Sequence, residues 1–172
     1  MLVSTKNKRE IKAESLRAAA RVMQRCDALA LASLNPDYIE RTYLSKAHAQ
    51  ANKIVEGWIS EAQMESWQDS VGNVWGRYTC KETNAPVLII GSHLDSVVNA
   101  GKYDGILGVL LGIELGNFLA RHQIDLPFHL DVVGFCDEDH KRSRPTMSIY
   151  LNLLKEKSVT SAKFGRNLTT HK

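Results

Sequence analysis

The sequence is poor in cysteine and contains no long uninterrupted apolar run. Its three cysteines, Cys26, Cys80 and Cys136, fit neither a disulfide framework nor a paired zinc knuckle, because they lie far apart. The longest apolar stretch, residues 106–118, is interrupted by Glu114 and is too short to span a bilayer. The amino-terminal segment lacks the apolar core of a secretory signal. We therefore expect a cytoplasmic protein with buried thiols and no membrane partner.

Charge is unevenly distributed along the 172 residues. The net charge is +3, yet residues 140–172 contain eight Lys or Arg and one acidic residue, Glu156. These basic residues are not interleaved with regularly spaced aromatic residues, as they would be in a nucleic-acid-binding module. The sequence therefore predicts a boundary between residues 1–139 and a basic tail over 140–172, and it predicts no nucleic-acid partner.

Apolar periodicity predicts two amphipathic helices, over residues 9–33 and 45–62, with Ser45 as the cap of the second. Residues 65–80 are typical of two short strands around a Gly-Asn turn, because aromatic and β-branched residues flank that pair.

A strand, a helix and a second strand are expected next, over residues 87–91, 105–122 and 128–139, and Val132, Val133 and Phe135 supply the apolar part of the second strand. The first strand is continuously apolar, which is typical of a strand buried on both faces. The helix contains four glycines, which indicates close packing against a sheet or another helix. A strand–helix–strand crossover predicts an α/β fold with a partly parallel mixed sheet flanked by helices.

Polar side chains follow both of these strands. His93, Asp95 and Asp104 come after the first, and the acidic run 137–139 comes after the second. Sites in open α/β sheets form at the carboxyl ends of the strands, so these groups are expected to converge. Crowded carboxylates repel one another unless a cation neutralises them, and one or two divalent metal ions would do so.

The spacing suggests how the site residues divide the work. Asp95 lies on the His93 side of an extended chain and could orient that imidazole. Asp104 opens the glycine-rich helix, where a carboxylate is favoured, and could bridge two metals. Glu138 and Asp139 point to different sides, so one could bind metal while the other acts as general base. Taken singly, the His93–Asp95 pair is better explained as a surface polar contact, and the acidic run 137–139 is better explained as a solvated strand end.

The combination of "VLIIGSHLDSVVNAGKYDGILGVLLGIE" with "GFCDED" is more specific. It resembles the family of allantoate amidohydrolases, N-carbamoyl-L-amino-acid hydrolases and β-ureidopropionases, in the clan of dinuclear zinc aminopeptidases and carboxypeptidases. The likeness covers about residues 25–139 and implies a zinc-peptidase-like catalytic domain. It further implies a small-molecule substrate and, in the intact family, a homodimer.

The resemblance also assigns roles to the site residues. His93 would bind one metal, Asp104 would bridge two, and Asp95 would orient His93. Glu138 would be the general base and Asp139 the next ligand. The family uses two Zn²⁺ or Mn²⁺ ions to activate water against a linear amide or ureido C–N bond.

The chain departs from the family after Asp139. The usual glutamate is replaced there by the shorter aspartate, and His140 replaces a glycine. Family members are more than twice as long and supply further ligands downstream. We therefore expect an incomplete N-terminal part of a metal-dependent amidohydrolase domain, with at most one weakly held metal and negligible turnover. Residues 140–172 would be a foreign tail, after a truncation or a frame change, or a diverged end.

Two alternatives stay open. The chain could be part of an aminopeptidase or dipeptidase of the same clan. It could also be a non-catalytic remnant whose basic tail contacts an acidic surface.

Overall fold

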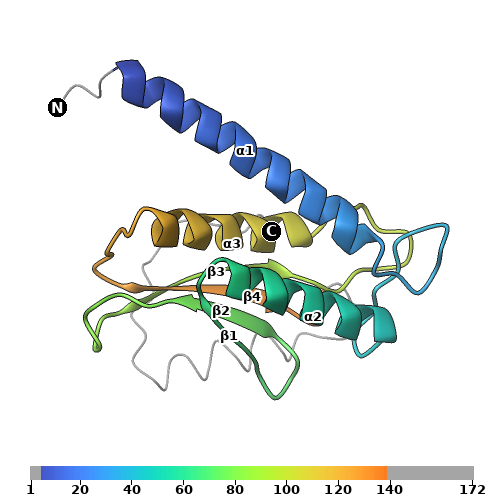
Figure 1. The fold of residues 1–172 in the computed structure, drawn as a ribbon. Helices are drawn as coiled ribbons and strands as arrows, with labels where there is room; N and C mark the ends of the chain where they lie inside the picture. Colours follow the sequence, from blue (N-terminus) through green and yellow to red (C-terminus); the bar gives the residue numbers. More distant parts are fainter. Residues whose placement is uncertain (1–4, 139–172) are drawn as a thin grey trace, which may run out of the picture.

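The structure is a computed structural model, and it describes residues 5–138. The basic tail predicted over residues 140–172 lies outside this range. Three helices and four strands form in the described part of the chain (Figure 1). The helices are α1 (Thr5–Ala30), α2 (Lys46–Glu61) and α3 (Ile106–Arg121). The strands are β1 (Glu65–Gln68), β2 (Val74–Tyr78), β3 (Val87–His93) and β4 (His129–Phe135). Within residues 5–138 no helix is both long and apolar enough to cross a membrane.

The four strands form one mixed sheet in the order β1-β2-β4-β3. β1 and β2 are an antiparallel hairpin, and β2 also pairs antiparallel with β4. β3 and β4 are parallel and are joined through α3, which confirms the predicted crossover. The α/β class with a partly parallel mixed sheet and flanking helices is therefore confirmed.

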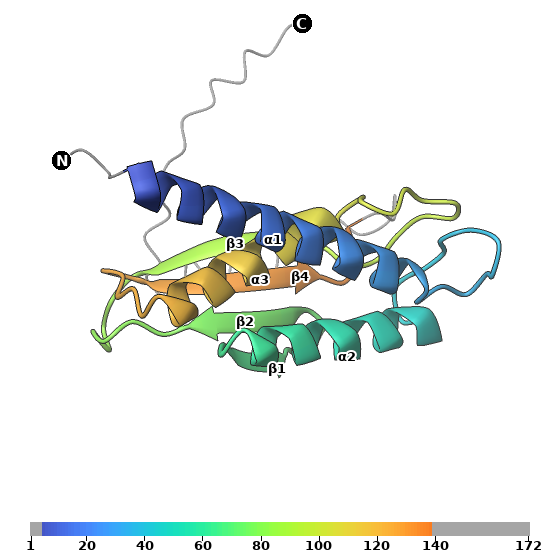
Figure 2. The same cartoon turned by 45° about the horizontal axis from the view of Figure 1, so that its top comes forward.

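The helices lie on one side of the sheet, and α1 packs on α3 as a further layer (Figures 1 and 2). α2 begins where the sequence predicts, because the Ser45 hydroxyl accepts a hydrogen bond from the His48 N–H at 3.1 Å. Its apolar stripe of Ala51, Val55 and Ile59 is buried against the sheet and α3.

The glycines of α3 bring this helix close to its neighbours, as predicted. A Cβ atom added at Gly108 or Gly112 would lie 2.8 Å from the nearest side-chain atom of the sheet. The neighbours in question are Ser92 of β3 and Val132 of β4. Any larger side chain at Gly108 or Gly112 would push α3 away from β3 and β4, the strands that the polar side chains follow.

The prediction that β3 is buried on both faces is wrong for the described structure. β3 lies at the edge of the four-stranded sheet, and its Leu88 side chain is 41% exposed. β4 is the buried strand, with Val132 and Val133 at 0% exposure, and it lies between β2 and β3. An apolar run shows that a strand can be buried, but what packs on each face of the sheet decides which side chains are covered.

All three cysteines are free and buried, which confirms the sequence prediction. Cys26 lies in α1, Cys80 follows β2, and Cys136 follows β4. Burial raises the pKa of the Cys136 thiol to about 11 and also raises the pKa of Cys26. The Cys26 and Cys136 thiols are therefore protonated near neutral pH.

Candidate functional site

The carboxyl ends of β3 and β4 meet at the same edge of the sheet. His93 pairs with Phe135, and the Leu94 N–H donates to the Phe135 carbonyl at 2.7 Å. The residues that follow the two strands therefore start side by side, as the parallel crossover predicts. This edge holds the candidate site.

His93 and Asp104 come together here although ten residues separate them. The Nε2 atom of His93 lies 3.7 Å from Oδ1 of Asp104, and their side chains are 12% and 52% exposed. Two atoms that bind one zinc ion at about 2.0–2.1 Å each can be at most about 4.2 Å apart. The observed separation therefore lets both atoms bind one cation without movement of either side chain.

Gly105 makes this approach possible. It is the N-cap of α3 with φ of +69°, a conformation that residues with a Cβ rarely adopt. A Cβ atom at this position would lie 2.5 Å from the His93 ring. Gly105 makes no side-chain hydrogen bond to cap the helix. The carboxylate of the preceding residue, Asp104, faces His93.

The His93 ring has a defined orientation. Its Nδ1 atom lies 3.0 Å from the main-chain oxygen of Asp95, and 3.7 Å from the Asp95 carboxylate. A carbonyl oxygen can only accept, so Nδ1 carries the proton in this bond. Nε2 is then the ring nitrogen that faces Asp104, and it is the atom with which a neutral imidazole in this tautomer binds a metal.

Asp95 connects the two strand ends. Its side chain is fully buried, and both carboxylate oxygens accept from the Glu138 main-chain N–H at 3.2 Å. The Glu138 side chain itself is exposed at the edge of the sheet. The structure thus brings His93, Asp95, Asp104 and Glu138 into one neighbourhood.

Asp139, the fifth residue predicted for the site, lies outside the described residues. Within residues 5–138 no group of three or more His, Cys, Asp or Glu side chains is close enough to hold a metal ion. At the edge of the sheet, the described residues thus provide the pair His93 and Asp104, which is a partial ligand set.

Sequence reasoning missed Arg41, whose side chain lies buried beneath the site. Its Nε donates to the Leu94 carbonyl at 2.6 Å, and Nη1 donates to the Leu29 and Ala32 carbonyls at 3.1 Å each. Burial lowers the pKa of Arg41, and the Asp95 charge opposes that shift. The buried guanidinium therefore ties α1 and the loop after it to the segment that carries Asp95.

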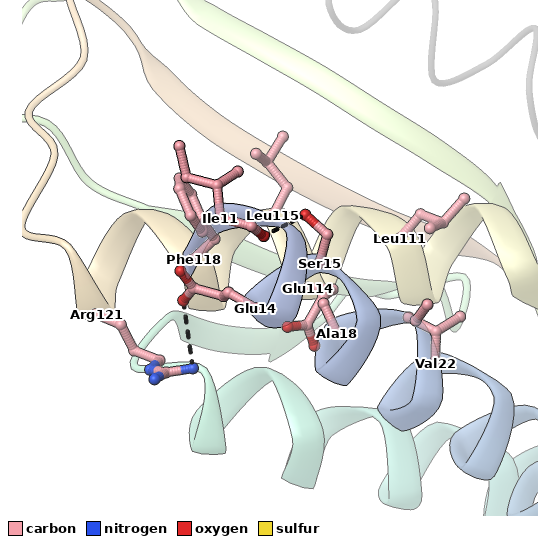
Figure 3. A pocket seen from close by; sticks show the side chains of 11 residues that line it. Ile11, Glu14, Ser15, Ala18, Val22, Leu111, Glu114, Leu115, Phe118 and Arg121 are labelled. Carbon is pink, nitrogen blue, oxygen red and sulfur yellow. Dashed lines mark hydrogen bonds and ion pairs between the residues drawn. The ribbon is translucent and has the colours of Figure 1, made fainter. Parts of the chain in front are cut away.

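A separate apolar groove lies between α1 and α3 (Figure 3). Leu111, Leu115 and Phe118 of α3 face Ile11 and Val22 of α1 across it. None of the predicted site residues lines this groove. We therefore place the chemistry at the edge of the sheet and assign the groove to the packing of α1.

Comparisons with known proteins bear on the fold and on the resemblance read from the motifs. No family model matches the chain. The allantoate deiminase of Arabidopsis thaliana is 38% identical over 114 residues, which cover 63% of this chain and 21% of that protein. The N-carbamoyl-L-amino-acid amidohydrolase of Pseudomonas sp. (strain NS671) is 38% identical over 104 residues, covering 60% and 25%. The chain is a homologue of these amidohydrolases.

The solved structures place the homologous region in the same fold. A hydantoinase/carbamoylase family amidase from Burkholderia ambifaria superposes with a TM-score of 0.64 and 28% identity, over 67% of this chain and 29% of that chain. The resemblance read from the motifs is thus confirmed. The chain spans about a fifth to a quarter of the length of the two curated relatives named above.

Proposed function

We propose that residues 1–139 form the N-terminal part of a metal-dependent amidohydrolase domain that cleaves a linear amide or ureido C–N bond. The substrate would be allantoate or an N-carbamoyl amino acid, in keeping with the names of the homologues. The observation that carries this proposal is the 3.7 Å separation between His93 Nε2 and Asp104 Oδ1 at the end of the parallel strands.

The donor atoms fit a divalent cation. Because Nδ1 of His93 donates to a carbonyl, Nε2 would be the metal-binding nitrogen, and the Asp104 carboxylate oxygen lies 3.7 Å from it. Asp139 would add the third ligand that this chain offers. A Zn²⁺ or Mn²⁺ ion bound there would polarise the scissile carbonyl and activate water.

The chain's own groups would then handle the proton. The Glu138 carboxylate would remove a proton from water as the water oxygen attacks the carbon of the amide or ureido group. As the C–N bond breaks, the same carboxyl group would return that proton to the departing nitrogen. Asp95 would hold the Glu138 main chain and the His93 ring in place throughout.

The proposal is tested by metal binding to the 172-residue chain and by ammonia release. We expect at most one weakly bound Zn²⁺ or Mn²⁺ per chain and negligible turnover on allantoate and N-carbamoyl amino acids. His93→Ala should abolish the metal binding. His122→Ala is the matched control, since His122 lies at the far end of α3 and contacts Glu14. Equal metal binding by both variants would refute the proposed site.

Measurements of turnover distinguish between the candidate substrates and show whether the isolated chain is impaired. Rapid ammonia release by the isolated chain would contradict the expected impairment. Cleavage of dipeptides in preference to ureido compounds would move the assignment to a peptidase of the same clan. A homodimer and a cytoplasmic location stay predictions for the protein to which this segment corresponds.

A further inference from the structure

Two buried side chains hold the segment that follows β4. The Cys136 N–H donates to Asn73 Oδ1 at 3.0 Å, and the Glu138 N–H donates to the Asp95 carboxylate at 3.2 Å. Asn73 is 1% exposed and Asp95 is 0% exposed. Asn73 comes from the turn before β2 and Asp95 from the loop after β3, so residues 136–138 are tied to two other parts of the chain.

The orientation of the Asn73 amide is fixed by Asp69. The Asn73 Nδ2 group donates to Asp69 Oδ2 at 2.9 Å, and a carboxylate oxygen can only accept from an amide NH₂. The amide oxygen therefore points the other way, toward Cys136. Asp69 is itself held, because its Oδ1 accepts from the main-chain N–H groups of Val71, Gly72 and Asn73.

We propose that Asn73 is a positioning residue that sets the place of Glu138 relative to His93 and Asp104. Residues 136 and 138 are two positions apart, so two side chains at fixed places restrain both the position and the rotation of this short segment. A general base acts efficiently only when it is held close to its working geometry. This inference rests on the proposed function, in which the Glu138 carboxylate moves the proton.

The test compares Asn73→Ala with Asn52→Ala in the full chain. Asn52 is a matched control, because it is 3% exposed and its side chain donates to Gly72 of the same turn rather than to residues 136–138. Amide hydrogen exchange, followed by NMR, reports the segment directly and needs no metal. Zn²⁺ titration of the same samples reports the site.

In Asn73→Ala we expect the Cys136 and Glu138 amides to exchange roughly tenfold faster, beyond any change at Val109 in the core. Zn²⁺ affinity should fall about tenfold, because the proposed ligand Asp139 directly follows Glu138 in the chain and would be displaced with it. Asn52→Ala should alter exchange at Val109 and at the segment equally and leave Zn²⁺ affinity within about twofold.

An equal exchange response of the segment in the two variants would overturn the positioning role. If the exchange contrast appears but the unmodified chain binds no Zn²⁺, the positioning role stands and the proposed function fails. Should Asn73→Ala not fold, Asp69→Asn replaces it, because this isosteric change removes the acceptor that orients Asn73. Cys136 exchange should then rise more than Glu138 exchange, and no rise at Cys136 would refute the inference.

Discussion

The carboxyl edge of the sheet and the contact between α1 and α3 are held by different kinds of interaction. At the carboxyl edge of the sheet, Arg41, Asn73 and Asp95 are at most 2% exposed and hold the chain through hydrogen bonds shielded from water. Along the groove of Figure 3, α1 is joined to α3 by ion pairs that are at least partly open to solvent, of which Glu14 with Arg121, at 3.7 Å, is more exposed than Arg21 with Glu114. Buried bonds define geometry closely, whereas exposed pairs fix it loosely and weaken with salt. The region that needs precise geometry has the buried kind.

The largest expected effect is at Arg41. Arg41→Met would leave buried carbonyls without their donors, and we expect the free energy of unfolding to fall by about 3 to 5 kcal/mol. Urea denaturation measures this loss. Arg17→Met on the exposed face of α1 should stay within about 0.5 kcal/mol. A loss below about 1 kcal/mol at Arg41 would show that the carbonyls find other partners.

The next largest effect is a difference in stability between alanine substitutions at Gly105 and at Gly57. Gly105→Ala should destabilise the chain by about 2 kcal/mol, because φ is positive and the new Cβ meets the His93 ring. Gly57→Ala in α2 should stabilise it by about 0.5 to 1 kcal/mol, since that Cβ meets nothing within 4 Å. Thermal unfolding and Zn²⁺ titration of both variants check this, and only Gly105→Ala should weaken metal binding. Equal stability of the two variants would contradict the close approach.

A smaller effect is expected where α1 meets α3. Arg21 donates to Glu114, whose side chain is 11% exposed, and Arg21→Ala should cost about 1 to 2 kcal/mol because Glu114 stays buried. Adding Glu114→Gln should restore part of this loss, because a neutral amide is cheaper to bury. Urea denaturation of the two single variants and of the double variant completes a double-mutant cycle, which gives the coupling free energy of the pair. Additive losses would mean that the pair does not interact in solution.

The smallest effect is a pH dependence of the α1 attachment. The hydrogen bond from His122 lowers the pKa of Glu14 below its ordinary value of 4.5. A lowered pKa in the folded state gives stability that is complete above pH 4.5 and is lost as the pH falls through the lowered pKa. The protection of the α1 amides, corrected for the intrinsic pH dependence of exchange, should therefore fall in that acidic range. In His122→Ala the pH response should weaken, and an unchanged response would assign it to other groups.

Local patterns predicted most of the fold and part of the site. The Ser45 cap, the glycine-rich α3 and the two polar strand ends each leave a signal within a few residues, and the parallel pairing of β3 with β4 then brings His93 near the segment that carries Glu138. The approach of Asp104 to His93 was likewise expected, because polar groups that follow the strands converge at the carboxyl edge of the sheet.

The supporting residues could not be predicted in this way. Arg41 bonds to a carbonyl 53 residues away, and Asn73 bonds to an N–H 63 residues away, so neither contact produces a periodic pattern. Asn73 was interpreted only as a turn residue, and arginine is seldom fully buried. The exposure of β3 was missed for a related reason, since its apolar run does not reveal which strands lie beside it.

The buried thiols make the molecule its own reporter of local opening. Because Cys26, Cys80 and Cys136 lie in α1, after β2 and beside the candidate site, alkylation of each one reads a different part of the chain. The Cys136 thiol, with its pKa raised to about 11, should react with a maleimide only while the end of β4 is transiently detached. Mass spectrometry of timed labelling would then rank the three regions by how often they open, with no added probe.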